Sequence, residues 1–166
     1  MSKVTYRLGT EEDFPIVKEF YVKLDGVFRH YGFNLPEPDD LGQAYLDSFS
    51  RTLGKFSQFW VAELDGEVVA YALMRIKHTP LFMGGVTVGE ISDAWIEPQA
   101  RRLGIGETLC HMGTEWLREQ KVHSVEISIL VGNEASWGML KPFGFKPELN
   151  QYRLMWEDYI PADKDE

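Results

Sequence analysis

The stretch IEPQARRLGIGET, residues 96–108, decides how this chain is interpreted. It starts at the end of a strand-like run, passes through Pro98 and two arginines, and enters a helical pattern at Gly104. Glycines let backbone amides approach a ligand, and the start of a helix presents unpaired N–H groups and the positive end of the helix dipole. Arg101 and Arg102 add fixed positive charge. The stretch therefore predicts an anion-binding turn between a strand and a helix.

Two other interpretations fit part of the same pattern. Glycines at the start of a helix also serve tight turns and close packing of a helix on a strand, with no ligand. A dinucleotide-binding fingerprint needs Gly-x-Gly-x-x-Gly early in a βαβ unit, whereas here several strands and helices are expected before the turn. The order of the strands and helices around the turn distinguishes these interpretations.

Hydrophobic periodicity divides the chain before the turn into alternating strand and helix patterns. Strands are predicted at residues 4–8, 56–64, 67–77 and 86–97, and helices at residues 11–30 and 39–52. Thr10 precedes three acids and is expected to cap the first helix. The dipeptide Asp65-Gly66 predicts a tight hairpin between two of the strands. The first part of the chain therefore predicts antiparallel strands in series with two helices near the start.

After the turn the pattern changes to alternating helix and strand. A helix is predicted at residues 104–121, a strand at 124–131, a short helix at 133–142 and a last strand or hairpin at 145–156. The strands that flank the first of these helices are expected to be parallel. The whole pattern predicts a mixed α/β fold in a single domain, residues 1–160, followed by a charged tail, residues 161–166.

Composition narrows the classes of function. The chain has 166 residues, 44% of them hydrophobic, and a formal net charge of −9, which argues against a nucleic-acid partner because phosphate backbones select a basic face. The acidity favours a cationic partner, or else only keeps the protein in solution. No apolar run is long enough to predict a signal peptide or a membrane span. Together with the lone Cys110, this predicts a cytoplasmic protein without a disulfide or membrane contact.

Two motifs in this order resemble the GNAT superfamily of acyl-CoA N-acyltransferases. The first is Pro98 followed by Arg101-x-x-Gly104-x-Gly106, and the second runs from Asn133 through a short helix to Gly144-Phe145. The resemblance implies a GNAT-type fold, with a mixed central sheet of six to seven strands and about four helices in the order β-α-α-β-β-β-α-β-α-β.

The resemblance also implies how acetyl-CoA binds. The residues expected to hold its pyrophosphate through the turn are Arg101, Arg102, Leu103, Gly104, Ile105 and Gly106, with the Thr108 hydroxyl nearby. The pantetheine arm is expected to pair with the main chain of Ala94, Trp95 and Ile96, as if it were an extra strand. Asn133 is expected either to bond this arm or to cap the following helix, and the two roles are compatible.

The chemistry requires a base, because an alkyl amine is mostly protonated at neutral pH. Glu90, eleven residues before Arg101, is expected to be that base, although an ordinary solvated strand residue fits the same pattern. Asp93 is expected on the opposite face of the strand unless a bulge intervenes. The N–H of Ala94 is expected to stabilise the oxyanion.

The general acid is the point at which this chain departs from the family pattern. Many relatives have a tyrosine seven residues after the motif asparagine, and this chain has Leu140 there. The remaining proton donors, none of which is favoured by spacing, are Cys110, His111, Ser136 and Tyr152. His and Cys do not cluster at metal-binding spacing, and no metal is expected.

The sequence therefore predicts an N-acetyltransferase that moves an acetyl group from acetyl-CoA to a primary amine of a small molecule or a protein. The acidic balance favours a basic small molecule such as a polyamine or an aminoglycoside, with amine contacts expected in residues 31–40. A homodimer is also consistent with the family. The alternative is a non-catalytic or weakly catalytic acyl-CoA-binding module of the same fold, which the presence of Leu140 favours.

Overall fold

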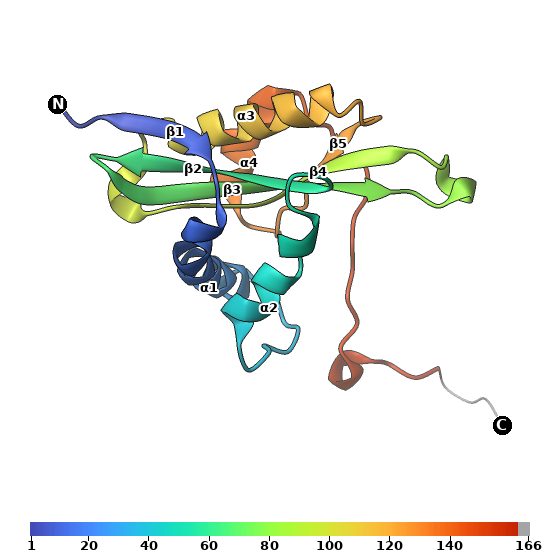
Figure 1. The fold of residues 1–166 in the computed structure, drawn as a ribbon. Helices are drawn as coiled ribbons and strands as arrows, with labels where there is room; N and C mark the ends of the chain where they lie inside the picture. The colour runs from blue at the N-terminus through green and yellow to red at the C-terminus, as the bar shows by residue number, and fades with distance from the viewer. Residues whose placement is uncertain (163–166) are drawn as a thin grey trace.

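A mixed β-sheet forms the centre of the computed structural model, which describes residues 1–162. Its strands are β1 (Val4–Leu8), β2 (Ser57–Leu64), β3 (Glu67–His78), β4 (Thr87–Ile96) and β5 (Val125–Glu126), in that spatial order (Figure 1). The first four strands pair antiparallel, and β5 pairs parallel to β4. The predicted parallel pair around the turn-helix unit is therefore confirmed.

The β2–β3 hairpin turns where the sequence predicts it. Asp65 and Gly66 have φ of 53° and 89°, so both central residues lie in the left-handed region. That backbone matches the right-handed twist of the two strands it joins, and Gly adopts it without steric cost. The register then pairs Leu64 with Glu67 and runs to Ser57 and Arg75 at the far end of the hairpin.

Helices cover both faces of the sheet (Figure 1). The helices α1 (Phe14–His30) and α2 (Leu41–Asp47) lie on one face, where Phe20, Phe59 and Tyr71 belong to the buried core. The helices α3 (Ile105–Glu119) and α4 (Glu134–Leu140) lie on the other face, over a second buried core. The mixed α/β architecture that the sequence predicts is confirmed. Continuous buried runs in β2 and β3 supply both cores, because successive side chains point to opposite faces of the sheet.

The start of α1 is tighter than predicted. Residues Glu11–Asp13 form a 3-10 turn, and the Asp13 carboxylate accepts a hydrogen bond from the Thr10 N–H at 2.8 Å. Asp13 also accepts from both guanidinium nitrogens of Arg7, at 2.8 and 2.9 Å. The buried Asp13 therefore ties the end of β1 to the start of the helix.

Helix α2 is capped by Asp40, a residue in the stretch where the sequence predicts contacts with the amine. Its carboxylate accepts a hydrogen bond from the Gln43 N–H at 3.0 Å. Asp40→Ala is expected to lower the free energy of unfolding by about 1 kcal/mol, because one orphan donor of a short helix loses its partner. Chemical denaturation measures the loss, and an unchanged KM for the acceptor separates capping from substrate binding.

The C-terminal part of the sheet differs from the prediction. Within residues 1–162 the structure has five strands and four α-helices, in place of six to seven strands. Of the strand predicted at 124–131, only the two residues of β5 form a strand. The strand or hairpin predicted at 145–156 does not form. The physical reason is that the pairing of β5 with β4 ends at Glu126, so the outer edge of β5 is only two residues long and too short for a following segment to build a ladder on. Residues 163–166 of the predicted tail lie outside the described residues.

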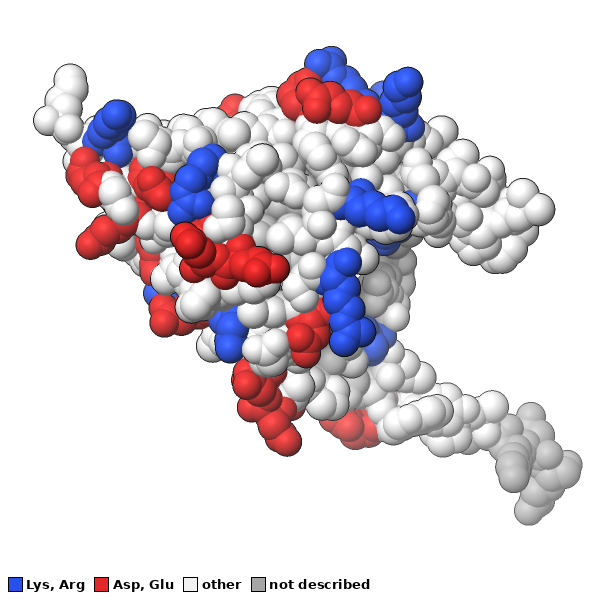
Figure 2. All heavy atoms as spheres, in the orientation of Figure 1, with Lys and Arg blue, Asp and Glu red and all other residues white. Residues whose placement is uncertain are grey.

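The surface mixes charges of both signs. On the face shown in Figure 2, Lys and Arg side chains are interspersed with Asp and Glu side chains. The β3–β4 hairpin protrudes at one end, and its tip exposes Leu81, Phe82 and Met83 at 88%, 87% and 62%. None of the helices within residues 1–162 is both long and apolar enough to cross a lipid bilayer.

Candidate active site

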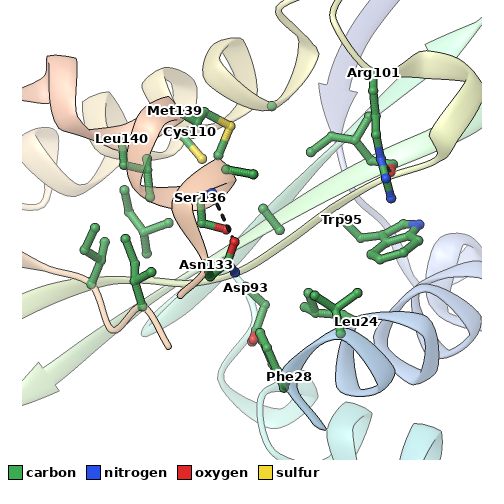
Figure 3. Close-up of a pocket in the computed structure, with 18 of the residues that line it drawn as sticks. Leu24, Phe28, Asp93, Trp95, Arg101, Cys110, Asn133, Ser136, Met139 and Leu140 are labelled. Carbon is green, nitrogen blue, oxygen red and sulfur yellow. Dashed lines mark hydrogen bonds between the residues drawn. The ribbon is translucent and has the colours of Figure 1, made fainter. Parts of the chain in front are cut away.

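A pocket opens where β4 and β5 separate, and it has a volume of about 880 Å³. The elements around it are β4, the turn before α3, the segment after β5, helix α4 and one side of α1 (Figure 3). Asp93, Trp95 and Arg101 line one part of it, and Asn133 and Ser136 line another. The pocket therefore joins most of the predicted site residues with a helix face that the sequence analysis did not assign to the site.

The gap exists because the pairing of β4 with β5 stops after two residue pairs, Gly89 with Val125 and Glu90 with Glu126. Further along β4, the Glu97 N–H donates to Val69 of β3 at 2.8 Å. Backbone groups alternate along an antiparallel strand, so the N–H groups of Ala94 and Ile96 point away from β3 and into the gap. Ala94 and Ile96 thus offer main-chain groups to an extended ligand, whereas the main chain of Trp95, the third residue predicted to pair with the pantetheine arm, faces β3.

A β-bulge at Ser92 decides which carboxylate faces the pocket. Across the β3–β4 ladder, Ile91 pairs with Met74 and Asp93 pairs with Leu73, so Ser92 has no partner. The extra residue reverses the alternation of side chains, so Asp93 shares the α1/α2 face with Glu90. The sequence predicts that Asp93 and Glu90 lie on opposite faces of the strand unless a bulge intervenes. That bulge is present, and Asp93 lines the pocket.

Asp93 lies in an environment that raises its pKa. Burial beneath α1 and α2 raises the pKa of this carboxyl from 3.8 to about 6, although the Tyr45 hydrogen bond and the Arg75 charge oppose the increase. The Tyr45 hydroxyl donates to Asp93 Oδ2 at 3.0 Å and lies 3.0 Å from the Tyr71 hydroxyl. The rings of Tyr21 and Tyr45 stack at 3.6 Å between centroids. A carboxylate with this pKa is mostly ionised at neutral pH and accepts protons readily.

Glu90 has a different environment from the one predicted for the base. It lines a second, smaller cavity and not the pocket, and it accepts hydrogen bonds from Lys77 Nζ at 2.7 Å and Ser92 Oγ at 2.8 Å. Burial raises the pKa of the Glu90 carboxyl, but these hydrogen bonds and the nearby charges of Lys77 and Arg75 outweigh it, so the net pKa is lowered. An ion-paired carboxylate of lowered pKa is a poor proton acceptor.

The predicted anion-binding turn has the backbone that its glycines suggest. Gly104 is the N-cap of α3 with φ of 74°, and Arg102 also has a positive φ, of 64°. The first hydrogen bond of the helix runs from the Thr108 N–H to the Gly104 carbonyl at 3.0 Å. The preceding amides, at Ile105 and Gly106, have no partner inside the helix and are available to an anion.

Not every predicted phosphate contact lies at the pocket. Arg101, Arg102, Gly104, Ile105 and Gly106 line it, whereas Leu103 and Thr108 do not. The Thr108 hydroxyl donates to the Gly104 carbonyl at 2.9 Å, so it stabilises the first turn of α3. The sequence could not separate these roles, because a hydroxyl at this position fits either partner.

Arg101 lies along the edge of β4. Its Nε donates to the Ile96 carbonyl at 3.0 Å, and its guanidinium group lies 5.2 Å from the centre of the Trp95 ring (Figure 3). The Ile96 carbonyl is one of the groups expected to pair with the pantetheine arm. A ligand that pairs with this carbonyl therefore competes with Arg101 for it.

The α4 side of the pocket holds the second motif. The Asn133 side chain accepts from the Ser136 N–H at 3.2 Å, so the helix-capping role is present while Asn133 also lines the pocket. Leu140, which stands where many GNAT relatives have a tyrosine, is buried in the pocket wall.

The four candidate proton donors lie in different environments. Cys110 and Ser136 line the pocket, but burial raises the pKa of the Cys110 thiol to about 12. His111 stacks on Phe143, and Tyr152 is 88% exposed.

Helix α1 contributes a wall of the pocket that the sequence pattern does not predict. Leu24, Val27 and Phe28 line the pocket, although periodicity assigns them only to a helix packed on the core. A sequence pattern shows which side of a helix is apolar. It does not show that part of this side lines a pocket, because the pocket exists only where β5 separates from β4. Within the stretch 31–40, only Tyr31 reaches the pocket. Within the described part of the chain, no group of three or more His, Cys, Asp or Glu side chains could hold a metal ion.

Comparison with known proteins gives a family match over most of the chain. Residues 19–145 match the model of the acetyltransferase (GNAT) family. An N-alpha-acetyltransferase of Sulfurisphaera tokodaii is 33% identical over 96 residues, which cover 53% of this chain and 56% of that protein. A proposed [ribosomal protein bS18]-alanine N-acetyltransferase of Bacillus subtilis is 26% identical over 103 residues, which cover 61% and 63%. The matches thus span between half and two thirds of these relatives' lengths.

Solved structures share the fold at low sequence identity. A predicted acetyltransferase from Clostridium acetobutylicum with acetyl-CoA is 16% identical with a TM-score of 0.72, over 95% of this chain and 99% of that one. The aminoglycoside N-acetyltransferase AAC(6')-Iy in complex with CoA is 17% identical with a TM-score of 0.71, over 93% and 96%. At this identity the likeness shows the fold alone.

Proposed function

The chain belongs to the GNAT acetyltransferase family, and we propose that it transfers an acetyl group from acetyl-CoA to a primary amine, with Asp93 as the base. The observation that carries the proposal is the position of Asp93. This carboxyl has a raised pKa and lines a pocket beside unpaired edge groups of β4. The relatives named as N-acetyltransferases support the same reaction class.

The residues of the pocket fit acetyl-CoA. Free amides at Ile105 and Gly106, with the charges of Arg101 and Arg102, suit the pyrophosphate. A Cβ built on Gly104 meets no atom within 4 Å, so the surface in front of this turn is open. The gap beside Ala94 and Ile96 suits an extended arm that makes main-chain hydrogen bonds. The cofactor residues predicted from sequence therefore stay in the proposal with three changes: Leu103 and Thr108 are neighbours rather than contacts, and Trp95 lines the pocket without offering its main chain to the arm.

The reaction needs two proton transfers. The ammonium group of the acceptor gives one proton to the Asp93 carboxylate, and the free amine attacks the thioester carbonyl. The N–H of Ala94 stabilises the oxygen that becomes negative in the tetrahedral intermediate. The carbon–sulfur bond then breaks, and the second proton of the nitrogen goes to the leaving thiolate. Acetyl-CoA supplies the activated acyl group, and the products are an amide and CoA, with one proton left on Asp93 for release to solvent.

The pKa of the base limits which amines react easily. An α-amino group, with a pKa of about 8, lies roughly two units above Asp93, whereas a lysine side chain at about 10.4 lies roughly four units above it. Each unit adds about 1.4 kcal/mol to the cost of proton transfer. We therefore favour acceptors with weakly basic amines, which the N-alpha and alanine acetyltransferase names of the two relatives also suggest.

The test of the proposed function measures CoA release from acetyl-CoA with a panel of amines and peptide N-termini. Turnover that depends on the amine, together with mass-spectrometric detection of the amide, supports the proposal. Binding of acetyl-CoA without turnover for any acceptor favours the alternative, a binding module in which Leu140 replaces the family tyrosine. Failure of CoA to raise the melting temperature overturns both.

The hydrogen bond from Tyr45 to Asp93 gives a prediction for the pH profile. Tyr45→Phe removes a donor that lowers the pKa of Asp93, so only the Arg75 charge still opposes the effect of burial and the pKa rises above about 6. The acidic limb of kcat/KM is expected to move to higher pH by about one unit. Tyr71→Phe is the matched control, because Tyr71 bonds the Tyr45 hydroxyl and not Asp93. Equal shifts in the two variants would contradict the direct role of Tyr45.

Three further expectations complete the proposal. Residues 1–160 are proposed to form one domain, and the family match at residues 19–145 lies inside it. A cytoplasmic location and a homodimer stay predictions. Size-exclusion chromatography with light scattering tests the oligomeric state.

A further inference from the structure

The part of the pocket beyond Asp93 has an apolar wall. Helix α1 contributes Leu24, Val27 and Phe28, and the segment after β5 contributes Ile129 and Leu130 from another side. Leu24 is buried, whereas the other four are only half-buried and keep apolar surface open to the pocket. In Figure 3, Phe28 and Leu24 project from α1 on the side of the pocket where Asp93 lies.

Tyr31 closes the end of this wall. Its ring lies against Gly132, where an added Cβ would stand 3.5 Å from the Tyr31 Cδ1. Helix α1 therefore meets the turn before α4 at Tyr31, which also lines the pocket, and this apolar part of the pocket is called the channel below. A ligand held here loses water from most of its length, which favours an apolar group.

The charges around the channel suit one ammonium group and oppose a second. Among the described residues that line the pocket, the carboxylates belong to Asp93 and Glu107. Glu107 lies in the first turn of α3, at the phosphate end of the pocket. On the α1 side the basic side chains are Lys23, which is paired with Glu97 at 2.5 Å, and His30. A second ammonium group in the channel would thus be desolvated without a carboxylate to pair with.

From this arrangement we infer that the acceptor carries one ammonium group on an apolar or aromatic body, which lies along Val27 and Phe28 while its nitrogen faces Asp93. The inference rests on the proposed function, since it places the acceptor nitrogen at the base. It excludes polyamines and aminoglycosides as the preferred acceptors, although the acidic composition favours them. On the face shown in Figure 2 the Asp and Glu side chains are interspersed with Lys and Arg, and among the described residues that line the pocket the carboxylates are those of Asp93 and Glu107.

The test uses conjugates in which the CoA sulfur is joined through an acetyl bridge to an amine, so binding is measured without turnover. The matched pair is hexylamine and hexane-1,6-diamine, which differ by one terminal amino group, and phenethylamine is the aromatic probe. By isothermal titration, the hexylamine and phenethylamine conjugates are expected to bind at least tenfold more tightly than CoA. The diamine conjugate is expected to bind at least tenfold more weakly than the hexylamine conjugate.

The outcomes separate this inference from the proposed function. A diamine conjugate that binds as tightly as the hexylamine conjugate overturns the inference, as does a hexylamine conjugate that binds no better than CoA, and in both cases the CoA site stands. Absence of CoA binding itself overturns the proposed function. Val27→Asp places a carboxylate in the channel and is expected to raise the relative affinity of the diamine conjugate at least tenfold. Val22→Asp, on the exposed side of the same helix, is the control and is expected to leave the ratio unchanged.

Discussion

Asp93→Asn is expected to lower kcat/KM for the acceptor amine by about 10²- to 10⁴-fold, the range that general-base catalysis contributes. Asparagine keeps the size of the side chain and can still accept the hydrogen bond from Tyr45, but it cannot take a proton from the ammonium group. The Kd of CoA is expected to stay within about twofold, because the phosphate turn lies elsewhere in the pocket. Steady-state kinetics and isothermal titration measure the two effects separately.

The same substitution is expected to stabilise the fold. The pKa of Asp93 is raised from 3.8 to about 6, so the stabilisation that comes with its neutral form is complete below pH 3.8 and is lost as the pH rises through about 6. At neutral pH the wild-type protein therefore holds a poorly solvated carboxylate, which asparagine replaces with a neutral group. The variant is expected to be more stable at pH 7.5 by about 2 kcal/mol, and the difference should disappear near pH 4.

Glu90→Gln is the matched control for the base. Glu90 shares the strand and the face with Asp93, but it is held by Lys77 and Ser92 outside the pocket. Its substitution is expected to change kcat/KM by less than about tenfold. A loss of the size expected for Asp93→Asn, with Asp93→Asn nearly normal, would assign the base to Glu90, as the sequence alone predicts.

Gly104→Val is expected to weaken binding of CoA by about tenfold to a hundredfold. Gly104 has φ of 74°, and a β-branched residue in the left-handed region costs about 1–2 kcal/mol, so the turn relaxes towards a different backbone. That relaxation moves the amides of Ile105 and Gly106, which are proposed to hold the pyrophosphate. Each 1.4 kcal/mol lost from binding is a factor of ten in Kd.

Gly54→Val provides a control with similar backbone strain. Gly54 has φ of 83° and, like Gly104, has no atom within 4 Å of an added Cβ, but it does not line the pocket. Both variants are expected to lose similar stability, and only Gly104→Val is expected to lose affinity for CoA. Equal losses of affinity would show that strain alone, and not the position of the amides, explains the effect.

The order of strands and helices before residue 121 was predicted correctly because their signals are local, although the helix predicted at 39–52 forms only at Leu41–Asp47 and is followed by the 3-10 turn Ser50–Thr52. Period-2 and period-3.6 patterns depend on neighbouring residues along one element, and the Asp65-Gly66 turn depends on two backbone conformations. The short β5 and the missing last strand were not predictable in this way. Whether residues 124–131 pair with β4 depends on the distance between two segments far apart in sequence, and no local pattern encodes it.

The sequence by itself determined the family, the mixed α/β class and the backbone of the turn before α3, since glycines and arginines at fixed spacing act through the backbone of a single segment. The tertiary structure alone decided which carboxylate faces the pocket, because a one-residue bulge at Ser92 reverses the side of β4 on which Asp93 lies. It also decided the character of the acceptor channel, because Val27 and Phe28 become a pocket wall only where β5 leaves β4. Both features depend on contacts between strands and helices that meet only in the folded chain.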